Sequence, residues 1–258
     1  MAGSVSVEVS GTLARVTLSH PGKFNAMSRA MWLQLRSVFE ALQQDRHLRA
    51  VLVQGEGGHF CAGGDISEYA DFRFAEENLR AFHEDEVWGG LQAMLACDLP
   101  IFAQIEGNCL GAGIEIASCC DLRFAAESAR FGVPIAKLGF PLAPREAAVV
   151  MHAVGELTAR EMLLTAAVLD ATEMKQRGFL NHVCSAAGLP AAVEVCVNRV
   201  SSLAPAAARL NKQSLRHIAQ ALHAQSAIDL VANAYQYADS PEHREGIAAF
   251  LEKRVAQF

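Results

Sequence analysis

The sequence predicts a layered α/β domain that is followed by helices alone. Apolar residues recur at every second position over residues 5–18, which indicates two half-buried strands. An apolar stripe at helical spacing follows over residues 31–42, behind the good N-cap Ser28, and an apolar strand over residues 50–53 comes next. The order strand, strand, helix, strand is the opening of a layered α/β fold. From about Ala143 onward the patterns predict only helices.

Capping residues predict where the helices of the second half begin and end. Thr158, with Glu161 three residues later, predicts a capping box at a helix start. Gly178 predicts a helix end, and Pro205 and Pro241 fit the first turns of two further helices. Together these signals predict a helical region at the C-terminal end of the chain.

Composition limits the class of protein. A chain of 258 residues with 52% hydrophobic and 19% charged residues can bury a full core, so one globular unit is expected. The net charge of -6 comes from interleaved acids and bases, and no basic patch is available for nucleic acid. The first ten residues lack the basic start and apolar run of a signal peptide, and no apolar run is long enough for a bilayer. We therefore expect a soluble cytoplasmic protein that binds neither nucleic acid nor membrane.

The cysteine and histidine patterns do not predict a metal site. Seven cysteines, an odd number, occur without C-x-x-C spacing, and buried free thiols are expected in a chain without an export signal. The adjacent Cys119 and Cys120 are expected to be small apolar residues on a packed helix. Nine histidines are scattered without the spacing of metal ligands, so no metal is expected.

Two glycine-rich turns, over residues 55–65 and 107–115, each follow a predicted strand. Small residues let a ligand approach the backbone, and the first N–H groups of a helix have no intrahelical partner. Two such N–H groups, brought together, can bind an oxyanion. A dinucleotide-binding motif is excluded by spacing, because the third glycine of G-x-G-x-x-G would fall on Ile116. The turns alone leave the function open.

Four segments, in order, match one family. Residues 20–27 read H-P-G-K-F-N-A-M, residues 60–66 read F-C-A-G-G-D-I, residues 105–121 contain G-A-G-I-E, and residues 245–254 read E-G-I-A-A-F-L-E-K-R. Over nearly its whole length the chain thus resembles the crotonase (enoyl-CoA hydratase/isomerase) superfamily. The resemblance implies an α/β fold, a crotonase-like spiral of ββα units over residues 1–200. It also implies a C-terminal helical trimerisation region over residues 201–258, and a homotrimer or dimer of trimers.

The resemblance also implies a set of site residues. Ala62 and Ala112 match the two positions whose backbone N–H groups form the family's oxyanion hole; alanine is tolerable at the second because the backbone is the donor. Coenzyme A is expected as part of the substrate, with no separate cofactor. The positions expected around the acyl-CoA are Lys23, Phe24, Ala62, Gly64, Asp65, Ile66, Gly111, Ile135, Phe250 and Lys253.

One carboxylate of the expected pair is present and the other is not. Glu115 matches the first of two glutamates that hydratases use, and it lies one helical turn after Ala112. The alternative for Glu115 is an early-helix acid that favours the helix dipole. Ile135 stands where the resemblance implies the second glutamate. Glu146 lies nearby but out of alignment, and an ion pair at the start of the next helix is its favoured explanation.

The activity that follows from this pattern is an acyl-CoA enzyme that stabilises a thioester enolate, nominally an enoyl-CoA hydratase. A single-carboxylate isomerase or a decarboxylase remains an alternative, because neither needs two carboxylates to divide the proton transfers. Two hypotheses come from other classes. One is a serine-protease relative, although Ser118 and Ser128 lack the context of a nucleophile. The other is a non-catalytic CoA-binding or scaffolding homologue.

Overall fold

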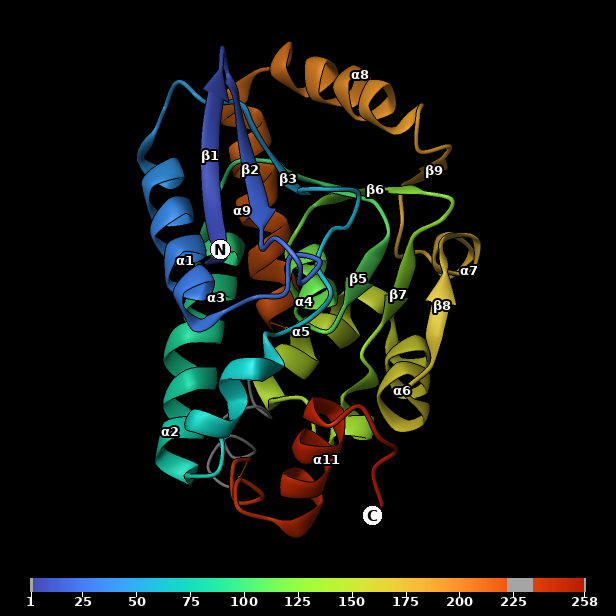
Figure 1. Ribbon diagram of the computed structural model, residues 1–258. Helices are drawn as coiled ribbons and strands as arrows, with labels where there is room; N and C mark the ends of the chain where they lie inside the picture. Colours follow the sequence, from blue (N-terminus) through green and yellow to red (C-terminus); the bar gives the residue numbers. More distant parts are fainter. Residues whose placement is uncertain (1, 222–233, 258) are drawn as a thin grey trace.

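The computed structural model describes residues 2–221 and 234–257, and it contains two β-sheets. The larger sheet opens with β1 (Ser4–Ser10), which pairs antiparallel with β2 (Leu13–Ser19). Parallel neighbours follow, and they are β3 (Ala50–Gly55), β4 (Ile101–Ile105), β6 (Leu122–Ala126) and β9 (His182–Cys184). The smaller sheet contains β5 (Asn108–Leu110), β7 (Arg130–Gly132) and β8 (Val168–Asp170). Figure 1 shows the smaller sheet beside the larger one, with helices around both.

The first layer forms as the sequence predicts. Helix α1 (Arg29–Gln44) connects β2 to β3, and the Ser28 side chain caps it by accepting a hydrogen bond from the Met31 amide. Its buried face packs on the core through Met31, Trp32, Leu35, Phe39 and Leu42. The predicted order strand, strand, helix, strand is therefore confirmed.

A mixed helical segment joins β3 to β4. It consists of the 3₁₀ helix η1 (Ile66–Asp71), α2 (Glu76–Ala81), the π-helix η2 (Phe82–Val87) and α3 (Trp88–Ala96). Helix α4 (Ala112–Ser118) follows strand β5 and packs against this strand and helix α5 (Pro144–Val154). π-Helical turns are rare and occur often at functional sites, which draws attention to η2.

The second half contains helices and two short strands. The helices are η3 (Pro134–Leu138), α5 (Pro144–Val154), α6 (Glu156–Thr165), α7 (Ala171–Gln176), α8 (Leu189–Ser201), α9 (Pro205–Ala221) and α11 (Pro241–Leu251). The expectation of helices alone after Ala143 is wrong, since β8 and β9 complete the two sheets. Strands of three residues are too short to show alternation in the sequence.

The predicted helix ends are correct in three cases and wrong in one. Gly178 adopts a φ of +84° just after α7, and Pro205 and Pro241 begin α9 and α11. The Thr158 capping box is wrong, because α6 begins at Glu156 after a sharp turn at Gly155 and Thr158 is buried inside the helix. The capping box of this region lies one element later, where Asp170 and Glu173 exchange hydrogen bonds at the start of α7. Threonine is a suitable capping residue, but the sharp turn at Gly155 sets the start of α6 at Glu156.

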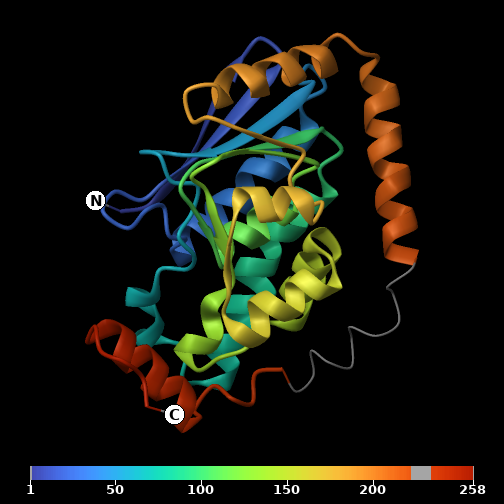
Figure 2. The same ribbon diagram turned by 90° about the vertical axis from the view of Figure 1, so that its right-hand side faces the viewer.

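The C-terminal helices contact the domain at two separate places. Helix α9 runs along one side of the molecule (Figure 2), where Lys212 donates a hydrogen bond to the Leu99 carbonyl and pairs with Asp121. Helix α11 packs on η3, and a Cβ atom at Gly246 would lie 2.2 Å from the Leu138 carbonyl carbon. The close approach therefore requires glycine at this position. The predicted division at residue 200 remains a prediction.

Two further sequence predictions can be compared with the structure. All seven cysteines are free thiols, and five of them are buried, which confirms the expectation for the cysteine set. Among the described residues, no helix combines the length and the apolar character needed to cross a membrane.

Candidate active site

The two glycine-rich turns lie side by side. The Cys61 amide donates to the Asn108 carbonyl, and the Leu110 amide donates back to the Cys61 carbonyl, at 2.8 and 2.9 Å. A Cβ atom at Gly111 would lie 3.4 Å from the Cα of Gly63, so the turns touch through backbone atoms. The predicted meeting of the two turns is thus observed, and it brings the first residue of α4 next to the loop before η1.

The free backbone donors at this junction differ from the expected pair at one position. Ala112 is the first residue of α4, so no carbonyl one turn earlier in the helix accepts its N–H. The Ala62 N–H, in contrast, donates to the Phe24 carbonyl at 3.0 Å. Within the described part of the chain, the Gly64 N–H has no such acceptor. The two turns therefore offer the amides of Gly64 and Ala112, while the Ala62 amide is already bonded.

Glu115 lies on α4, one turn beyond Ala112, and only 5% of the residue is exposed. Burial raises the pKa of its carboxyl well above the usual value, and the charge of Glu146 adds to this rise while Arg73 opposes it. Burial also raises the pKa of Tyr69 to about 12, and both Glu115 and Glu146 contribute to that rise. The two carboxyl groups therefore share one buried environment next to Tyr69.

Glu146 does not form the ion pair that its sequence position suggests. Its neighbour Arg145 pairs with Glu84 instead. The Glu146 side chain is 2% exposed, and its Oε1 atom lies 2.6 Å from Nδ1 of His83 on η2. Helix α5, which carries Glu146, packs against α4, which carries Glu115. The prediction of an ion pair for Glu146 at the start of this helix is wrong, because the fold turns the acid inward onto His83, and Arg145 pairs with Glu84.

Arg73 is fully buried beside this pair, and its partners are neutral. The guanidinium donates to Nε2 of His83, Nε2 of His243 and Oη of Tyr237, at 3.3 to 3.4 Å. It also lies 4.4 Å from the ring centre of Tyr69 and 4.2 Å from that of Phe140. Among the described residues, no carboxylate pairs directly with Arg73. The nearest negative charges are those of the buried glutamates, which Arg73 influences through space.

The hydrogen bonds of Arg73 fix the tautomers of two histidines. Arginine only donates, so Nε2 of His83 accepts and its Nδ1 carries the proton that is donated to Glu146. For the same reason Nδ1–H of His243 donates to the Ala238 carbonyl. Burial lowers the pKa of His83 well below the usual value, and the charge of Arg73 lowers it further. Each imidazole ring is therefore neutral; it accepts a hydrogen bond from Arg73 and donates one to a second group, which is Glu146 for His83 and the Ala238 carbonyl for His243.

No spacing pattern in the sequence predicts this cluster. Arg73, His83 and Glu146 come from the loop after η1, from η2 and from α5, and only the packing of these elements brings them together. The one available signal was Glu146 itself, an acid placed just before an apolar helix. Tyr69 lies four residues after the first turn, and nothing in the sequence spacing places it beside the carboxyl groups.

The residues expected to contact coenzyme A group around the first turn. Lys23 donates to Asp65 at 2.6 Å and to Ser67 at 2.8 Å. Burial acts to raise the pKa of Asp65, but the hydrogen bonds from Lys23 and Ser67 outweigh it and hold that pKa below its usual value. Phe24 is 56% exposed and its ring lies 4.5 Å from that of His59, while Ile66 is half-buried. These side chains belong to the segments that precede and follow Gly64.

The remaining predicted contacts lie farther along the chain. Ile135, on η3, is half-buried and packs against the main core. Phe250 and Lys253 are exposed at the end of α11, which itself packs on η1 and η3. Their contact with coenzyme A stays a prediction.

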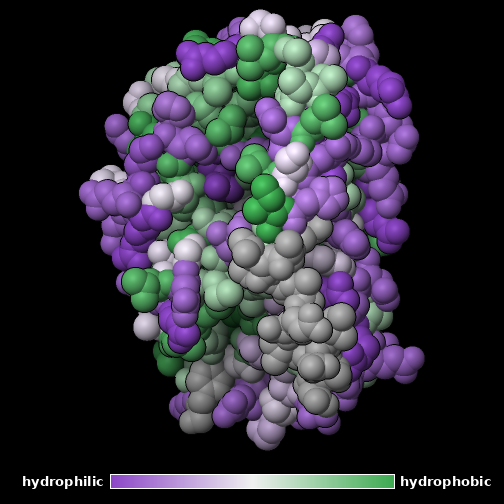
Figure 3. Space-filling model, turned by 180° about the vertical axis from the view of Figure 1, so that it is seen from behind, coloured by the Kyte–Doolittle hydropathy of each residue, from purple (hydrophilic) through white to green (hydrophobic). Residues whose placement is uncertain are grey.

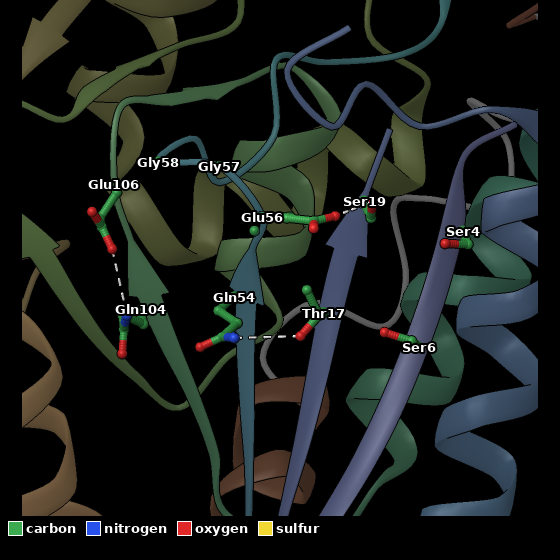
Figure 4. Close-up of a pocket in the computed structure, with 11 residues that line it drawn as sticks. Ser4, Ser6, Thr17, Ser19, Gln54, Glu56, Gly57, Gly58, Gln104 and Glu106 are labelled. Carbon is green, nitrogen blue, oxygen red and sulfur yellow. Dashed lines mark hydrogen bonds between the residues drawn. The ribbon is translucent and has the colours of Figure 1, made fainter. Parts of the chain in front are cut away.

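A polar cavity of about 580 Å³ lies apart from these residues, over the ends of β1 to β4. Figure 4 shows its serine, threonine and glutamine side chains pointing from neighbouring strands, with Glu56 bonded to Ser19. Neither buried glutamate lines it, so it is not part of the carboxyl cluster.

Comparison with known proteins identifies the family and agrees with the fold. Residues 8–258 match the enoyl-CoA hydratase/isomerase family, and the chain belongs to this family. A probable enoyl-CoA hydratase of Mycobacterium bovis is 29% identical over 257 residues, covering 99% of this chain and 97% of the relative. The crystal structure of an enoyl-CoA hydratase/carnithine racemase from Magnetospirillum magneticum has a TM-score of 0.82 and 32% identity, with 98% of this chain and 94% of that chain covered. A methylmalonyl-CoA decarboxylase structure has a TM-score of 0.86 and 25% identity, with 98% and 97% covered. The predicted crotonase-like α/β fold is confirmed.

Proposed function

We propose that the protein is an enoyl-CoA hydratase that stabilises a thioester enolate between the backbone amides of Gly64 and Ala112. The observation that carries this proposal is the position of Glu115, a buried carboxyl one helical turn beyond a free helix N-terminus. The match to hydratases along almost the whole chain supports it. Gly64 replaces the expected Ala62 as donor, because the Ala62 amide is bonded to Phe24.

The chemistry follows from where charge develops. Addition of water to an enoyl thioester places negative charge on the thioester oxygen, and two amides aimed at that oxygen stabilise it. One such donor is typically worth ~2.7–4 kcal/mol. Glu115 then transfers a proton to or from the substrate carbon, and its raised pKa suits an acid that must hold a proton near neutral pH.

Binding, assembly and location complete the proposal. Lys23, Phe24 and Asp65 would hold coenzyme A, and the Lys23 side chain, which is 40% exposed, would offer its positive charge to a phosphate. A homotrimer or dimer of trimers would cover apolar side chains of α9, among which Leu215 is 68% and Ile218 is 62% exposed. On the face seen from behind, hydrophobic and hydrophilic side chains lie interspersed (Figure 3). We place the protein in the cytoplasm, without a separate cofactor.

The isoleucine at position 135, where the second glutamate was expected, supports a second candidate activity. With one carboxylate, the same oxyanion hole would serve an isomerase, which returns one proton, or a decarboxylase, which needs only the enolate to be held. The likeness to a methylmalonyl-CoA decarboxylase structure favours the latter as the second candidate. A non-catalytic CoA-binding homologue is the candidate from another class.

One panel of thioesters tests these activities. Crotonyl-CoA, a 3-enoyl-CoA and a malonyl-type thioester are incubated with the wild type and with Glu115→Gln. We expect loss of crotonyl-CoA absorbance in the wild type, and a decrease of about 10²-fold or more in the variant with acyl-CoA affinity retained. Turnover of only the second or third thioester would replace hydration by isomerisation or decarboxylation. Wild-type turnover in Glu115→Gln would reject Glu115, and no turnover together with no thermal shift by coenzyme A would favour the scaffold.

A further inference from the structure

The position of the missing second acid is filled by an isoleucine, yet a second carboxyl group is buried next to Glu115. Ile135 is half-buried and apolar, so η3 supplies no acid to the site. Glu146 enters instead from α5, the helix that follows η3, and α5 packs against α4. An unpaired buried carboxylate would be costly, and the residues around Glu146 show how its charge is accommodated.

The His83 ring holds Glu146 directly, and two further side chains hold that ring. Nδ1–H of His83 donates to Oε1 at 2.6 Å, and Nε2 of the same ring accepts from Arg73 at 3.3 Å. The His83 ring also stacks on Tyr235, with ring centres 5.6 Å apart and an interplanar angle of 15°. The π-helix η2 places His83 between Arg73 and Glu146, which fixes the direction of the carboxyl group. Such a chain of hydrogen bonds through a neutral ring is an arrangement that positions a reacting group.

Among the described residues, Glu84 is paired with Arg145, and the charges that remain around Arg73 balance when Glu115 and Glu146 share one proton. Arg73 contributes one buried positive charge and has no directly paired carboxylate among the described residues. Two ionised glutamates would leave an excess negative charge in a buried site, and two protonated ones would leave Arg73 uncompensated. One ionised and one protonated carboxyl make the cluster neutral.

We propose that Glu146, held by His83 and faced by Arg73, is the second carboxylate of the site and shares one proton with Glu115. This inference rests on the proposed hydration of an enoyl-CoA. In the free enzyme Glu146 is the ionised member, because it is bonded to the relay from Arg73, and Glu115 is the protonated member. Burial raises the pKa of both groups, and the ionised Glu146 raises that of Glu115 further.

The proton transfers then balance over one turnover. Glu146 takes a proton from water as the water oxygen forms a bond to the β-carbon, and the π electrons of the double bond move toward the thioester oxygen. That oxygen is held as an enolate by the two amides. The enolate collapses as the α-carbon takes the proton of Glu115. Glu146 then returns its proton to Glu115, which restores the free enzyme, and the net reaction is addition of H and OH.

The groups that face Glu146 define its titration. The titratable or charged side chains that surround it are Tyr69, Arg73, His83, Glu84, Glu115, Tyr235, Tyr237 and His243. The pKa values of the three tyrosines are raised and those of the two histidines are lowered, with burial as the main cause. Within the described part of the chain, the groups that can carry charge at neutral pH around this centre are therefore the Arg145–Glu84 ion pair, Arg73 and the two glutamates Glu115 and Glu146.

The experiment compares α-proton exchange, which needs one carboxylate, with hydration, which needs two. Hydration of crotonyl-CoA and exchange of the α-protons of butyryl-CoA in D₂O are measured in parallel for the wild type, Glu146→Gln and Glu115→Gln. We expect Glu146→Gln to lose hydration by about 10²-fold or more, and to keep α-proton exchange within about threefold. Glu115→Gln should lose both. Glu156→Gln, an exposed acid in the first turn of the adjacent helix α6, is the matched control and should change neither.

A second measurement needs no substrate and keeps the two proposals distinguishable. Infrared difference spectra against pH report the carboxylic acid band of a buried glutamate. We expect one protonated carboxyl in the wild type at neutral pH, absent in Glu115→Gln and deprotonating at lower pH in Glu146→Gln. Absence of hydration and exchange in the wild type would reject the proposed function, while the infrared titration would still decide whether the proton is shared. Unchanged hydration together with unchanged Glu115 titration in Glu146→Gln would overturn the inference.

His83 is tested as a positioning residue. His83→Asn keeps an N–H donor near the position of Nδ1, whereas His83→Leu removes it. We expect His83→Asn to rescue hydration relative to His83→Leu, and the acidic limb of the pH–rate profile to move upward in the leucine variant because Glu146 loses its donor. Equal pH profiles in the two variants would contradict a role through Glu146.

Discussion

The hydroxyl group of Tyr69 occupies the space beside Gly64 that a side chain would need. A Cβ atom built on Gly64 would lie 2.0 Å from Oη of Tyr69 and 3.1 Å from its Cζ. Tyr69 is buried and its ring lies against Arg73, so it has little freedom to withdraw. A side chain at residue 64 would therefore displace Tyr69 or the backbone that carries the unbonded Gly64 amide.

Replacing Gly64 with alanine should therefore abolish the first amide donor as a ligand for the substrate. The backbone at Gly64 does not have a positive φ, so alanine is conformationally allowed and the damage is local. We expect kcat/KM for crotonyl-CoA to fall by about 10²- to 10³-fold, the effect of losing one oxyanion donor. The measurement is steady-state kinetics, with thermal unfolding as the test of folding.

Gly57→Ala is the matched control for this variant. Gly57 lies near the start of the first glycine-rich turn and has no atom within 4 Å of an added Cβ, although alanine at its φ of +68° will cost about 1–2 kcal/mol of stability. Activity should be retained there. Partial recovery is expected when Tyr69→Phe is added to Gly64→Ala, because the closest contact is removed. Full activity of Gly64→Ala would return the donor role to Ala62.

Arg73→Met should move the pH dependence of the reaction in a direction fixed by charge. The positive charge of Arg73 lowers the pKa of Glu146 and of Glu115. Its removal raises both values, so the acidic limb of the pH–rate profile, which reports ionisation of the base, should shift to higher pH. Methionine keeps much of the volume between the rings of Tyr69 and Phe140. The measurement is kcat/KM for crotonyl-CoA as a function of pH.

Arg80→Met is the comparison for Arg73→Met. Arg80 pairs with Glu76 on the surface of α2 and lies over the Tyr235 ring. The Arg80→Met substitution therefore removes one positive charge from the same region without changing a direct contact of Glu115 or Glu146. Its pH profile should match that of the wild type. A limb that stays in place in Arg73→Met, or moves to lower pH, would contradict the charge assignment.

The sequence predicted the scaffold of the site better than its chemistry. Glycines after a strand and acids in the first turn of a helix determine the backbone over a few neighbouring residues. The turns around Gly63 and Gly111 and the position of Glu115 could therefore be predicted. The donor at Gly64 could not be distinguished from Ala62, because the choice depends on a hydrogen bond to Phe24 from a distant loop.

The second carboxylate was hidden for a related reason. Glu146 reads as a surface acid at a helix start, and His83 lies in a polar stretch without clear periodicity. A π-helix and the packing of α5 on α4 turn both side chains inward. These are tertiary effects without a pattern of fixed spacing, so only the three-dimensional structure brings the groups together.

Glu115→Gln should flatten the dependence of stability on pH. The folded-state pKa of Glu115 is raised well above its usual 4.5, so above pH 4.5 the folded protein binds more protons than the unfolded chain. The free energy of unfolding must then fall as pH rises from 4.5 through the folded-state pKa, by up to ~1.4 kcal/mol per pH unit for one proton. Glutamine removes this contribution, and urea unfolding over this range should show a smaller slope than in the wild type.

Glu245→Gln gives the opposite control for the pH slope. Hydrogen bonds from Arg254 and the Gln257 amide lower the pKa of Glu245 to about 2, so its contribution changes only as pH falls below 4.5. The slope at higher pH should be unaffected by this variant. An identical slope in the wild type and Glu115→Gln would show that the Glu115 carboxyl is not held protonated by the fold.

Arg123→Met should destabilise the helix that carries Glu115. The Arg123 side chain donates to the carbonyls of Ala117 and Cys120 at the end of α4, at 3.3 and 2.7 Å, and to that of Phe179 at 2.6 Å. The Ala117 and Cys120 carbonyls lie at the C-terminal end of α4, so the cation serves as a C-terminal cap for this helix. Loss of three hydrogen bonds to a charged donor should lower the free energy of unfolding by about 3 kcal/mol.

Arg130→Met is the matched control. Arg130 is exposed and donates one hydrogen bond, to the neighbouring Ala129 carbonyl, so this substitution should change the free energy of unfolding by less than about 0.5 kcal/mol. Equal urea midpoints for the two variants would show that α4 does not depend on this cap.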